Sequence, residues 1–335
     1  MGRGHPKQPH RSPARRILLT AAAILTAVTL TSAGTTPDPY TGPAAAAAAP
    51  RLTTSTLDER CAAVRADIAA ALATARRIGD DDRARVLSAF LASGRRFLAF
   101  DARGHGKAVE VHGDLARAGR VAVVVPGADG ELDNYDSWKF AGGGARALHQ
   151  QMSREAAGER VAVVAWLGYD SPSTLSPVVL TGDRAATAAR RLGRFLDQLH
   201  RVNPAARVAL LGHSYGSVIV GKAAAGRTAP PVTEIALFGS PGTSLDSAAD
   251  LRTPARVWAG RSSGDWMRYL PHAEFAGLGF GADPTAATFG ALRFDAGSGT
   301  HAEYLKPGST SLRNLARISL GRTPQEVSHA RHTDA

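Results

Sequence analysis

Runs of apolar, largely β-branched residues recur along the middle of the chain, and each has the length of a strand buried on both faces. Stretches at helical periodicity separate them, at residues 144–156, at 183–200 and directly after Ser214. Strands and helices that alternate in this way predict a mostly parallel sheet with helices on both faces. The six expected strands are residues 120–125, 160–166, 207–211, 234–238, 255–259 and 291–294.

The part of the chain before these strands carries two further patterns. Apolar residues recur at helical spacing across residues 57–78, and again across 80–93 after Gly79. Together these segments predict a helical hairpin that precedes the sheet. Two short strand-like runs, residues 97–101 and 107–112, come next and predict a β-hairpin.

The third expected strand leads into Gly212-His213-Ser214-Tyr215-Gly216, a G-x-S-x-G pattern with a helix-like segment after it. The pattern alone is a weak signal, because 35 of the 335 residues are glycine. Its position between a buried strand and a helix is the context in which a tight turn presents a nucleophilic serine. Such a turn leaves no room for side chains two residues before and after the serine. We therefore predict Ser214 to be a nucleophile at the carboxyl end of a strand.

A serine hydroxyl is a poor nucleophile until a histidine takes its proton and a carboxylate orients that histidine. The order expected along the chain is nucleophile, acid, histidine. Asp265 follows the fifth expected strand after a short loop, and His301 follows the sixth strand and the flexible residues 297–299. We take Asp265 as the acid and His301 as the base, and we expect His213 to point away from Ser214. The competing residues are Asp246, Asp250, Asp283 and Asp295 for the acid, and His272, His329 and His332 for the base.

An oxyanion hole needs two backbone N–H groups near the serine. The residue after the nucleophile, Tyr215, should supply one, and Ala128, or its neighbour Gly127, should supply the other from the loop after the first strand. Loops 129–143 and 167–182 are expected to form the pocket rim, although aromatic residues there could equally serve packing. The candidate substrate-binding residues are Asp129, Trp166 and Tyr169.

Composition narrows the class of protein without naming a substrate. The formal net charge is +11, and about +7 of it lies beyond the first fifty residues, mostly as scattered arginine. We find no basic stripe interleaved with aromatic residues, so we expect no nucleic-acid partner. The scattered arginines favour a solvated, arginine-rich exterior, and peripheral association with an anionic cell envelope is the alternative. The single cysteine, Cys61, cannot form a disulfide within the chain, and we expect no metal or cofactor and a monomer.

The amino-terminal segment resembles an export signal. Five basic residues precede the apolar run 17–30, and the small residues 31–33 follow it. We expect residues 1–33 to be a signal peptide of the Sec or Tat type, with an uncleaved anchor as the alternative. The remaining expected boundaries are a linker at 34–54, the helical segment at 55–95, the catalytic domain at 96–322 and a polar tail at 323–335.

Five short motifs together resemble a family of actinobacterial α/β-hydrolases whose function is largely unassigned. They are Val125-Pro126-Gly127, Trp166-Leu167-Gly168-Tyr169, Gly212-His213-Ser214-Tyr215-Gly216-Ser217, Gly239-Ser240-Pro241-Gly242 and the passage from Gly299 to Tyr304. One departure is Thr300, where similar proteins tend to have glycine directly before the histidine. The resemblance implies the α/β-hydrolase fold and the same triad, but no substrate.

These expectations converge on an exported or envelope-associated serine hydrolase. A small-molecule or lipid ester is the leading substrate, and a peptidase or amidase would use the same three residues. A non-catalytic envelope-binding module is the alternative from another class, and it would have no need of serine, aspartate and histidine together.

Overall fold

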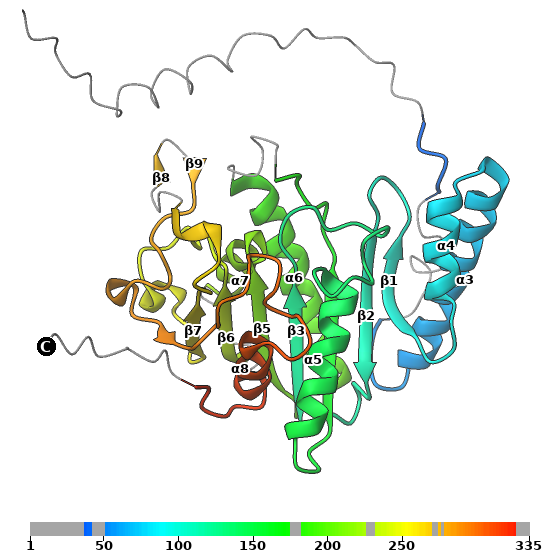
Figure 1. The fold of residues 1–335 in the computed structure, drawn as a ribbon. Coiled ribbons are helices and arrows are strands. Elements are labelled where there is room, and N and C mark those ends of the chain that lie inside the picture. The colour runs from blue at the N-terminus through cyan, green and yellow to red at the C-terminus, as the bar shows by residue number, and fades with distance from the viewer. Residues whose placement is uncertain are drawn as a thin grey trace, which may run out of the picture. The chain divides into compact units, whose positions relative to one another are not determined.

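A single sheet organises the part of the chain that the computed structural model describes, which is residues 37–41, 51–174, 182–225, 232–269, 274–275 and 278–325. Eight of the described strands pair in the order β1-β2-β4-β3-β5-β6-β7-β10 (Figure 1). All of them belong to one compact unit, Asp38–Ala335. The strands are β1 (Arg96–Asp101), β2 (Lys107–Gly113), β3 (Arg120–Val125), β4 (Val161–Leu167), β5 (Arg207–His213), β6 (Val232–Phe238), β7 (Arg256–Gly260) and β10 (Leu292–Arg293).

The expected parallel sheet is confirmed from β4 to β10. Within that span every neighbouring pair runs parallel, whereas β1 pairs antiparallel with β2, and β2 pairs antiparallel with β4. Each residue of β4 is buried, as its uninterrupted apolar sequence requires of a strand covered on both faces. The sixth expected strand is shorter than its apolar run, because only Leu292–Arg293 pairs with β7.

Four helices cover the two faces of this sheet. Helix α5 (Ala141–Glu155) packs against α8 (Thr310–Ser319), and α6 (Gly182–Val202) packs against α7 (Tyr215–Ala224). Figure 1 shows α5 and α8 in front of the strands and the other pair behind them. Helix α8 is an element that our sequence interpretation did not include, and its capping residue Ser309 accepts a hydrogen bond from the Leu312 N–H.

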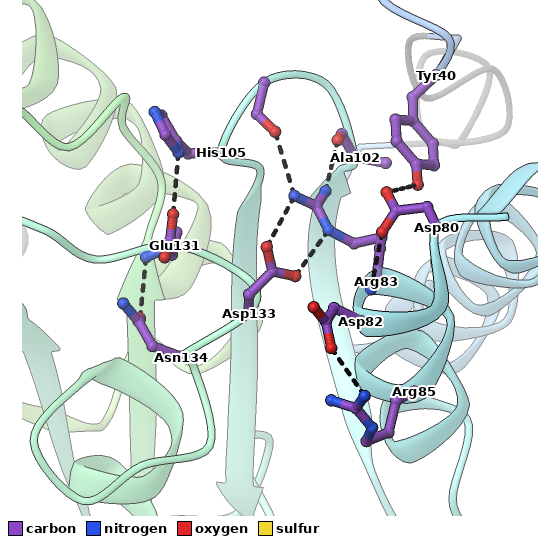
Figure 2. Close-up of polar contacts among 11 residues, drawn as sticks. Tyr40, Asp80, Asp82, Arg83, Arg85, Ala102, His105, Glu131, Asp133 and Asn134 are labelled. Atoms are coloured by element: carbon purple, nitrogen blue, oxygen red, sulfur yellow. Dashed lines mark hydrogen bonds and ion pairs between the residues drawn. The ribbon is translucent and has the colours of Figure 1, made fainter. Parts of the chain in front are cut away.

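The expected helical hairpin forms at the β1 edge of the sheet. Helix α3 (Leu57–Ile78) ends at Gly79, which takes the left-handed conformation, and α4 (Asp81–Phe90) follows. The buried guanidinium of Arg83 attaches α4 to the β1–β2 turn by donating to the Ala102 carbonyl at 2.9 Å. It also pairs with Asp133 of the β3–α5 loop at 2.9 Å (Figure 2).

Parts of the expected linker pack on this unit. Tyr40 is buried and its hydroxyl donates to the Asp80 carboxylate at 2.7 Å, as Figure 2 shows. Leu52 is buried in the main core. The expected signal peptide, residues 1–33, lies outside the described residues, as does most of the expected polar tail. None of the described helices combines the length and the apolar character that crossing a membrane would need.

The segment between β7 and β10 is built from short elements. Its described residues include two 3₁₀ turns, η3 (Trp266–Tyr269) and η4 (Ala287–Phe289), and another such turn, η2 (Ala248–Leu251), lies just before β7. A small antiparallel pair, β8 (Glu274–Phe275) with β9 (Leu278–Gly279), stands apart from the main sheet (Figure 1). This segment matters because η3 lies directly after Asp265.

Candidate active site

Ser214 occupies the turn between the central strand β5 and helix α7. Its backbone has φ 50° and ψ −126°, a conformation that an L-residue adopts only under constraint. The two glycines supply that constraint through close packing. A Cβ atom on Gly216 would lie 2.3 Å from the Val125 carbonyl oxygen, and one on Gly212 would lie 2.7 Å from the Ser217 Cα. The expected tight turn is therefore present, and Ser214 stands at the carboxyl end of β5.

Two loops bring a histidine and an aspartate to this serine. The Nε2 atom of His301 lies 3.0 Å from the Ser214 Oγ. The Nδ1 atom of the same ring lies 2.9 Å and 3.0 Å from the two carboxylate oxygens of Asp265. Asp265 lies in the loop after β7 and His301 in the loop after β10, so adjacent parallel strands deliver both. The structure thus joins the three sequence-predicted residues in one hydrogen-bonded chain.

Asp265 is fully buried, and its carboxylate is held by several donors. The Tyr304 hydroxyl donates to Oδ2 at 2.6 Å, and the Met267 N–H donates to Oδ1 at 2.9 Å. Burial by itself would raise the pKa of Asp265, but the hydrogen bonds from His301, Tyr304 and Met267 outweigh it and hold that pKa below its usual value. The carboxylate is therefore ionised at neutral pH and able to orient an imidazole.

His213 supports the loop that carries His301. Its Nε2 lies 2.8 Å from the His301 backbone carbonyl oxygen, and its ring stacks on Phe238 with centroids 5.3 Å apart. Burial, together with the neighbouring His301, lowers the pKa of His213 to about 3. The ring is therefore neutral, and Nε2 carries the hydrogen because a carbonyl can only accept. Among the described contacts, the His213 side chain bonds to the His301 backbone and not to Ser214.

The loop after β3 lies against the serine. A Cβ atom on Gly127 would come within 2.8 Å of the Ser214 Cβ and 3.3 Å of its Oγ, so only a glycine backbone can lie this close to the serine side chain. The Ala128 N–H follows in the next peptide, and the Tyr215 N–H begins helix α7. In the described part of the chain, neither N–H donates to a protein acceptor. Both are the groups that the sequence suggested for an oxyanion hole.

The three candidate substrate-binding residues make contacts within the protein. Asp129 is exposed, and its carboxylate accepts from the Thr174 N–H at 2.9 Å. Trp166 and Tyr169 are both buried and stack with ring centroids 6.0 Å apart. The Tyr169 hydroxyl donates to backbone carbonyls of the β3 loop, at 2.7 Å for the Gly127 oxygen. The structure therefore places Tyr169 against the backbone of the β3 loop, Trp166 against the Tyr169 ring, and Asp129 against the loop that follows β4.

The four competing aspartates, all of them described, do not join the hydrogen-bonded chain from Ser214 through His301 to Asp265. Among the bases, His272, His329 and His332 lie outside the described residues. The aspartates have other environments: Asp246 is exposed, Asp250 caps η2, Asp283 pairs with Arg261 at 2.8 Å, and Asp295 accepts from the Gly297 N–H at 2.8 Å.

Sequence reasoning did not assign a role to Tyr304, although this residue is part of the site. Its hydroxyl donates to Asp265 and accepts from the Ser262 N–H at 3.0 Å, so it connects the carboxylate to the backbone of the β7 loop. The available signal was its spacing, three residues after His301. Among the described residues, no cluster of three or more His, Cys, Asp or Glu side chains is arranged to hold a metal ion.

Comparison with known proteins places this arrangement in a family. The family model described as alpha/beta hydrolase matches residues 101–275, just over half of the chain. The chain belongs to this alpha/beta hydrolase family. The match begins at the end of β1 and includes Ser214 and Asp265. The mostly parallel sheet of this hydrolase agrees with that assignment.

The curated relatives of this alpha/beta hydrolase are mycobacterial. Uncharacterized protein Rv2079 of Mycobacterium tuberculosis is 30% identical over 253 residues, which are 65% of this chain and 37% of the relative. Uncharacterized protein Mb0988c of Mycobacterium bovis is 33% identical over 145 residues, 42% of this chain and 53% of the relative. The chain thus spans little more than a third of the length of the first of these relatives.

Solved structures with a similar chain path include two hydrolases. XC6422 from Xanthomonas campestris, described as an a/b serine hydrolase without lid, is 15% identical, covers 69% of this chain and 95% of its own, and has a TM-score of 0.40. Esterase PE8 is 14% identical, covers 62% of this chain and 94% of its own, and has a TM-score of 0.42.

Proposed function

We propose that this alpha/beta hydrolase is an exported serine hydrolase that cleaves a carboxylic ester or a lipid acyl bond. The observation that carries the proposal is the unbroken hydrogen-bond chain from the Ser214 Oγ through His301 to Asp265. The ionised, buried carboxylate and the free N–H groups of Tyr215 and Ala128 support the same reading, because each matches a part that acyl transfer requires.

In the proposed reaction, Ser214 attacks the substrate carbonyl carbon while His301 Nε2 takes the hydroxyl proton. Asp265 stabilises the imidazolium that forms, and the Tyr215 and Ala128 N–H groups hold the oxyanion. His301 then gives its proton to the leaving alkoxide, which departs as an alcohol and leaves an acyl-enzyme. A water molecule, deprotonated by His301, attacks the acyl carbon, and the proton returns to Ser214 as the carboxylic acid leaves.

An apolar acyl or alcohol group suits the surface beside His301. The Trp266 ring lies 5.1 Å from the His301 ring, centroid to centroid, and 43% of this residue is exposed. Tyr269, at the other end of η3, is 80% exposed. Exposed aromatic rings next to a reactive group bind apolar surface readily. We therefore favour an ester with an apolar chain over a small polar one.

Hydrolysis of p-nitrophenyl esters of graded acyl length tests this proposal, with peptide anilides assayed in parallel. We expect ester turnover, a rise in kcat/KM with acyl length, and loss of that rise in Trp266→Ala. Ser214→Ala should reduce kcat by about 10⁴-fold or more. Preferential cleavage of the anilides would replace the esterase by an amidase, and inactivity of the folded protein on both substrate classes would refute a hydrolase built on Ser214.

We further propose that the protein is exported or associated with the cell envelope. It acts as a monomer on an ester substrate and has no nucleic-acid partner. The support for export is the basic and apolar pattern of residues 1–33. Amino-terminal sequencing of protein recovered from the culture medium should begin after residue 33. Recovery of the full chain only from the cell interior would contradict export.

A further inference from the structure

Two loops beside Ser214 are bonded to each other rather than standing independently. Residues 126–130 follow β3, and residues 168–174 follow the neighbouring strand β4. The Asp129 N–H donates to the Pro172 carbonyl at 2.9 Å, and the Asp129 carboxylate accepts from both the N–H and the hydroxyl of Thr174. The conformation of the first loop therefore depends on that of the second.

The Tyr169 side chain reaches from the second loop to the first. Its ring lies between the rings of Trp166 and Tyr215, with centroid distances of 6.0 and 6.3 Å and interplanar angles of 14° and 24°. This stack is buried, so the position of the hydroxyl is fixed. The hydroxyl lies 2.9 Å from the Pro126 carbonyl oxygen and 2.7 Å from that of Gly127.

Ser171 supplies a second donor to the same carbonyl. Its Oγ donates to the Gly127 oxygen at 3.1 Å and accepts from the Gly130 N–H at 3.1 Å. In a planar trans peptide the C=O and N–H bonds point in opposite directions. Two donors that hold the Gly127 carbonyl therefore also fix the direction of the Ala128 N–H. Rotating this peptide would break both hydrogen bonds.

We propose that Tyr169 and Ser171 are positioning residues that orient the Gly127–Ala128 peptide so that the Ala128 N–H faces the oxyanion formed at Ser214. This inference rests on the proposed function, since it needs an acyl-transfer reaction at Ser214. Gly127 lies within contact of Ser214, so a change in this peptide acts directly at the reacting atoms. Neither side chain has to touch the substrate to have this effect.

The test is ester hydrolysis by Tyr169→Phe, Ser171→Ala and the double variant, with the active enzyme counted by fluorophosphonate titration. Tyr169→Phe keeps the stacked ring and removes the hydroxyl. Loss of an oxyanion donor costs about 10²–10³-fold in kcat. We expect each single variant to lose roughly 10-fold and the double variant roughly 100-fold in kcat, with KM changed less than about twofold. Affinity for a phenylboronic acid, which forms a tetrahedral adduct with serine, should fall in parallel with kcat.

Tyr135→Phe is the matched control. Tyr135 is also fully buried, and its hydroxyl has no hydrogen-bond partner among the described residues, so kcat and boronate affinity should stay at the wild-type level. If the wild type is active and the double variant keeps its kcat and boronate affinity, the positioning role is wrong. The proposed function is not affected by that result. A rise in KM at constant kcat would also overturn it, because that result indicates substrate binding. A wild type that neither hydrolyses esters nor reacts with fluorophosphonate would refute the proposed function, and the positioning role with it.

Discussion

His213 and His301 lie side by side, with ring centroids 4.9 Å apart, yet the structure gives them different electrostatic environments. His301 contacts the Asp265 carboxylate, whereas burial keeps His213 neutral. A neutral neighbour does not oppose the positive charge that His301 acquires during the proposed reaction. At the scale of single residues, the site therefore depends on burial of one histidine as much as on the reactivity of the other.

The buried His213 predicts a pH dependence of stability. The pKa of His213 is about 3 in the folded protein, and an unfolded histidine titrates near 6.5. Between these values the unfolded state binds one more proton at this residue, so stability falls as pH falls from about 6.5 to 3. His213 therefore contributes a slope of about 1.4 kcal/mol per pH unit to the free energy of unfolding.

Urea unfolding of the wild type and of His213→Gln at pH 7, 6 and 5 measures this slope. As pH falls, the free energy of unfolding should decrease less steeply in His213→Gln than in the wild type. The difference between the two slopes should be about that of one proton. Equal slopes for both proteins would contradict a neutral, buried His213.

At the scale of elements, the turn from β5 to α7 fixes both Ser214 and the neighbouring β3 loop. Gly216 lies in the first turn of α7, against the Val125 and Pro126 carbonyls. The same contact therefore sets how far the helix can approach the backbone that carries Gly127 and Ala128.

Gly216→Ala should damage both stability and activity. Its Cβ would lie 2.3 Å and 2.5 Å from those two carbonyl oxygens, so the backbone has to move. We expect a loss of about 1–3 kcal/mol in the free energy of unfolding and a fall in kcat of at least roughly 10-fold.

Gly119→Ala is the control. The atoms nearest to its added Cβ belong to the flexible side chain of Glu159, so the free energy of unfolding and kcat should both change little. Urea unfolding and ester kinetics give the two quantities. A Gly216→Ala protein with wild-type stability and kcat would show that the turn is not tightly packed.

The strands of the main sheet were predictable from sequence because most of them, β3 to β6 above all, are continuous runs of buried apolar residues, and their bounds agree within a few residues. Strand order was not predictable, since the antiparallel pairing of β2 with β4 depends on tertiary contacts that local pattern does not contain. Helix α8 carries Leu312, Leu315 and Ile318 at helical spacing, but short polar loops around it weaken that signal. The structure brings together Ser214, Asp265 and His301 as the chain order suggested, and their roles stay predictions.

At the scale of the whole molecule, the site depends on long-range contacts that no single motif specifies. The hydrogen bond between Ser214 and His301 joins residues 87 positions apart, and the β3 and β4 loops complete the surroundings. The amino-terminal hairpin is attached to the β3–α5 loop by the contact between Arg83 and Asp133. Sequence could suggest the hairpin but not this attachment, because a buried arginine on a helix has no local signature.

Arg83→Ala should destabilise the whole unit. The side chain is 8% exposed, and its removal leaves the buried Ala102 carbonyl without this donor and Asp133 without its ion pair. We expect a loss of about 2–3 kcal/mol in the free energy of unfolding, measured in urea.

Arg85→Ala is the matched control from the same helix. Arg85 pairs with Asp82 (Figure 2), and both side chains are more than 70% exposed. Removing Arg85 should therefore lower the free energy of unfolding by less than about 0.5 kcal/mol. Equal stability losses in the two variants would contradict the anchoring role of Arg83.

The central claim is that Ser214 is a nucleophile activated by His301. Labelling with a fluorophosphonate probe tests it most directly, in wild type, Ser214→Ala and His301→Ala, each checked for folding by circular dichroism. We predict covalent labelling of the wild type at Ser214, none of Ser214→Ala, and a large reduction for His301→Ala. A folded wild type that remains unlabelled, or labelling that persists in Ser214→Ala, would contradict the claim.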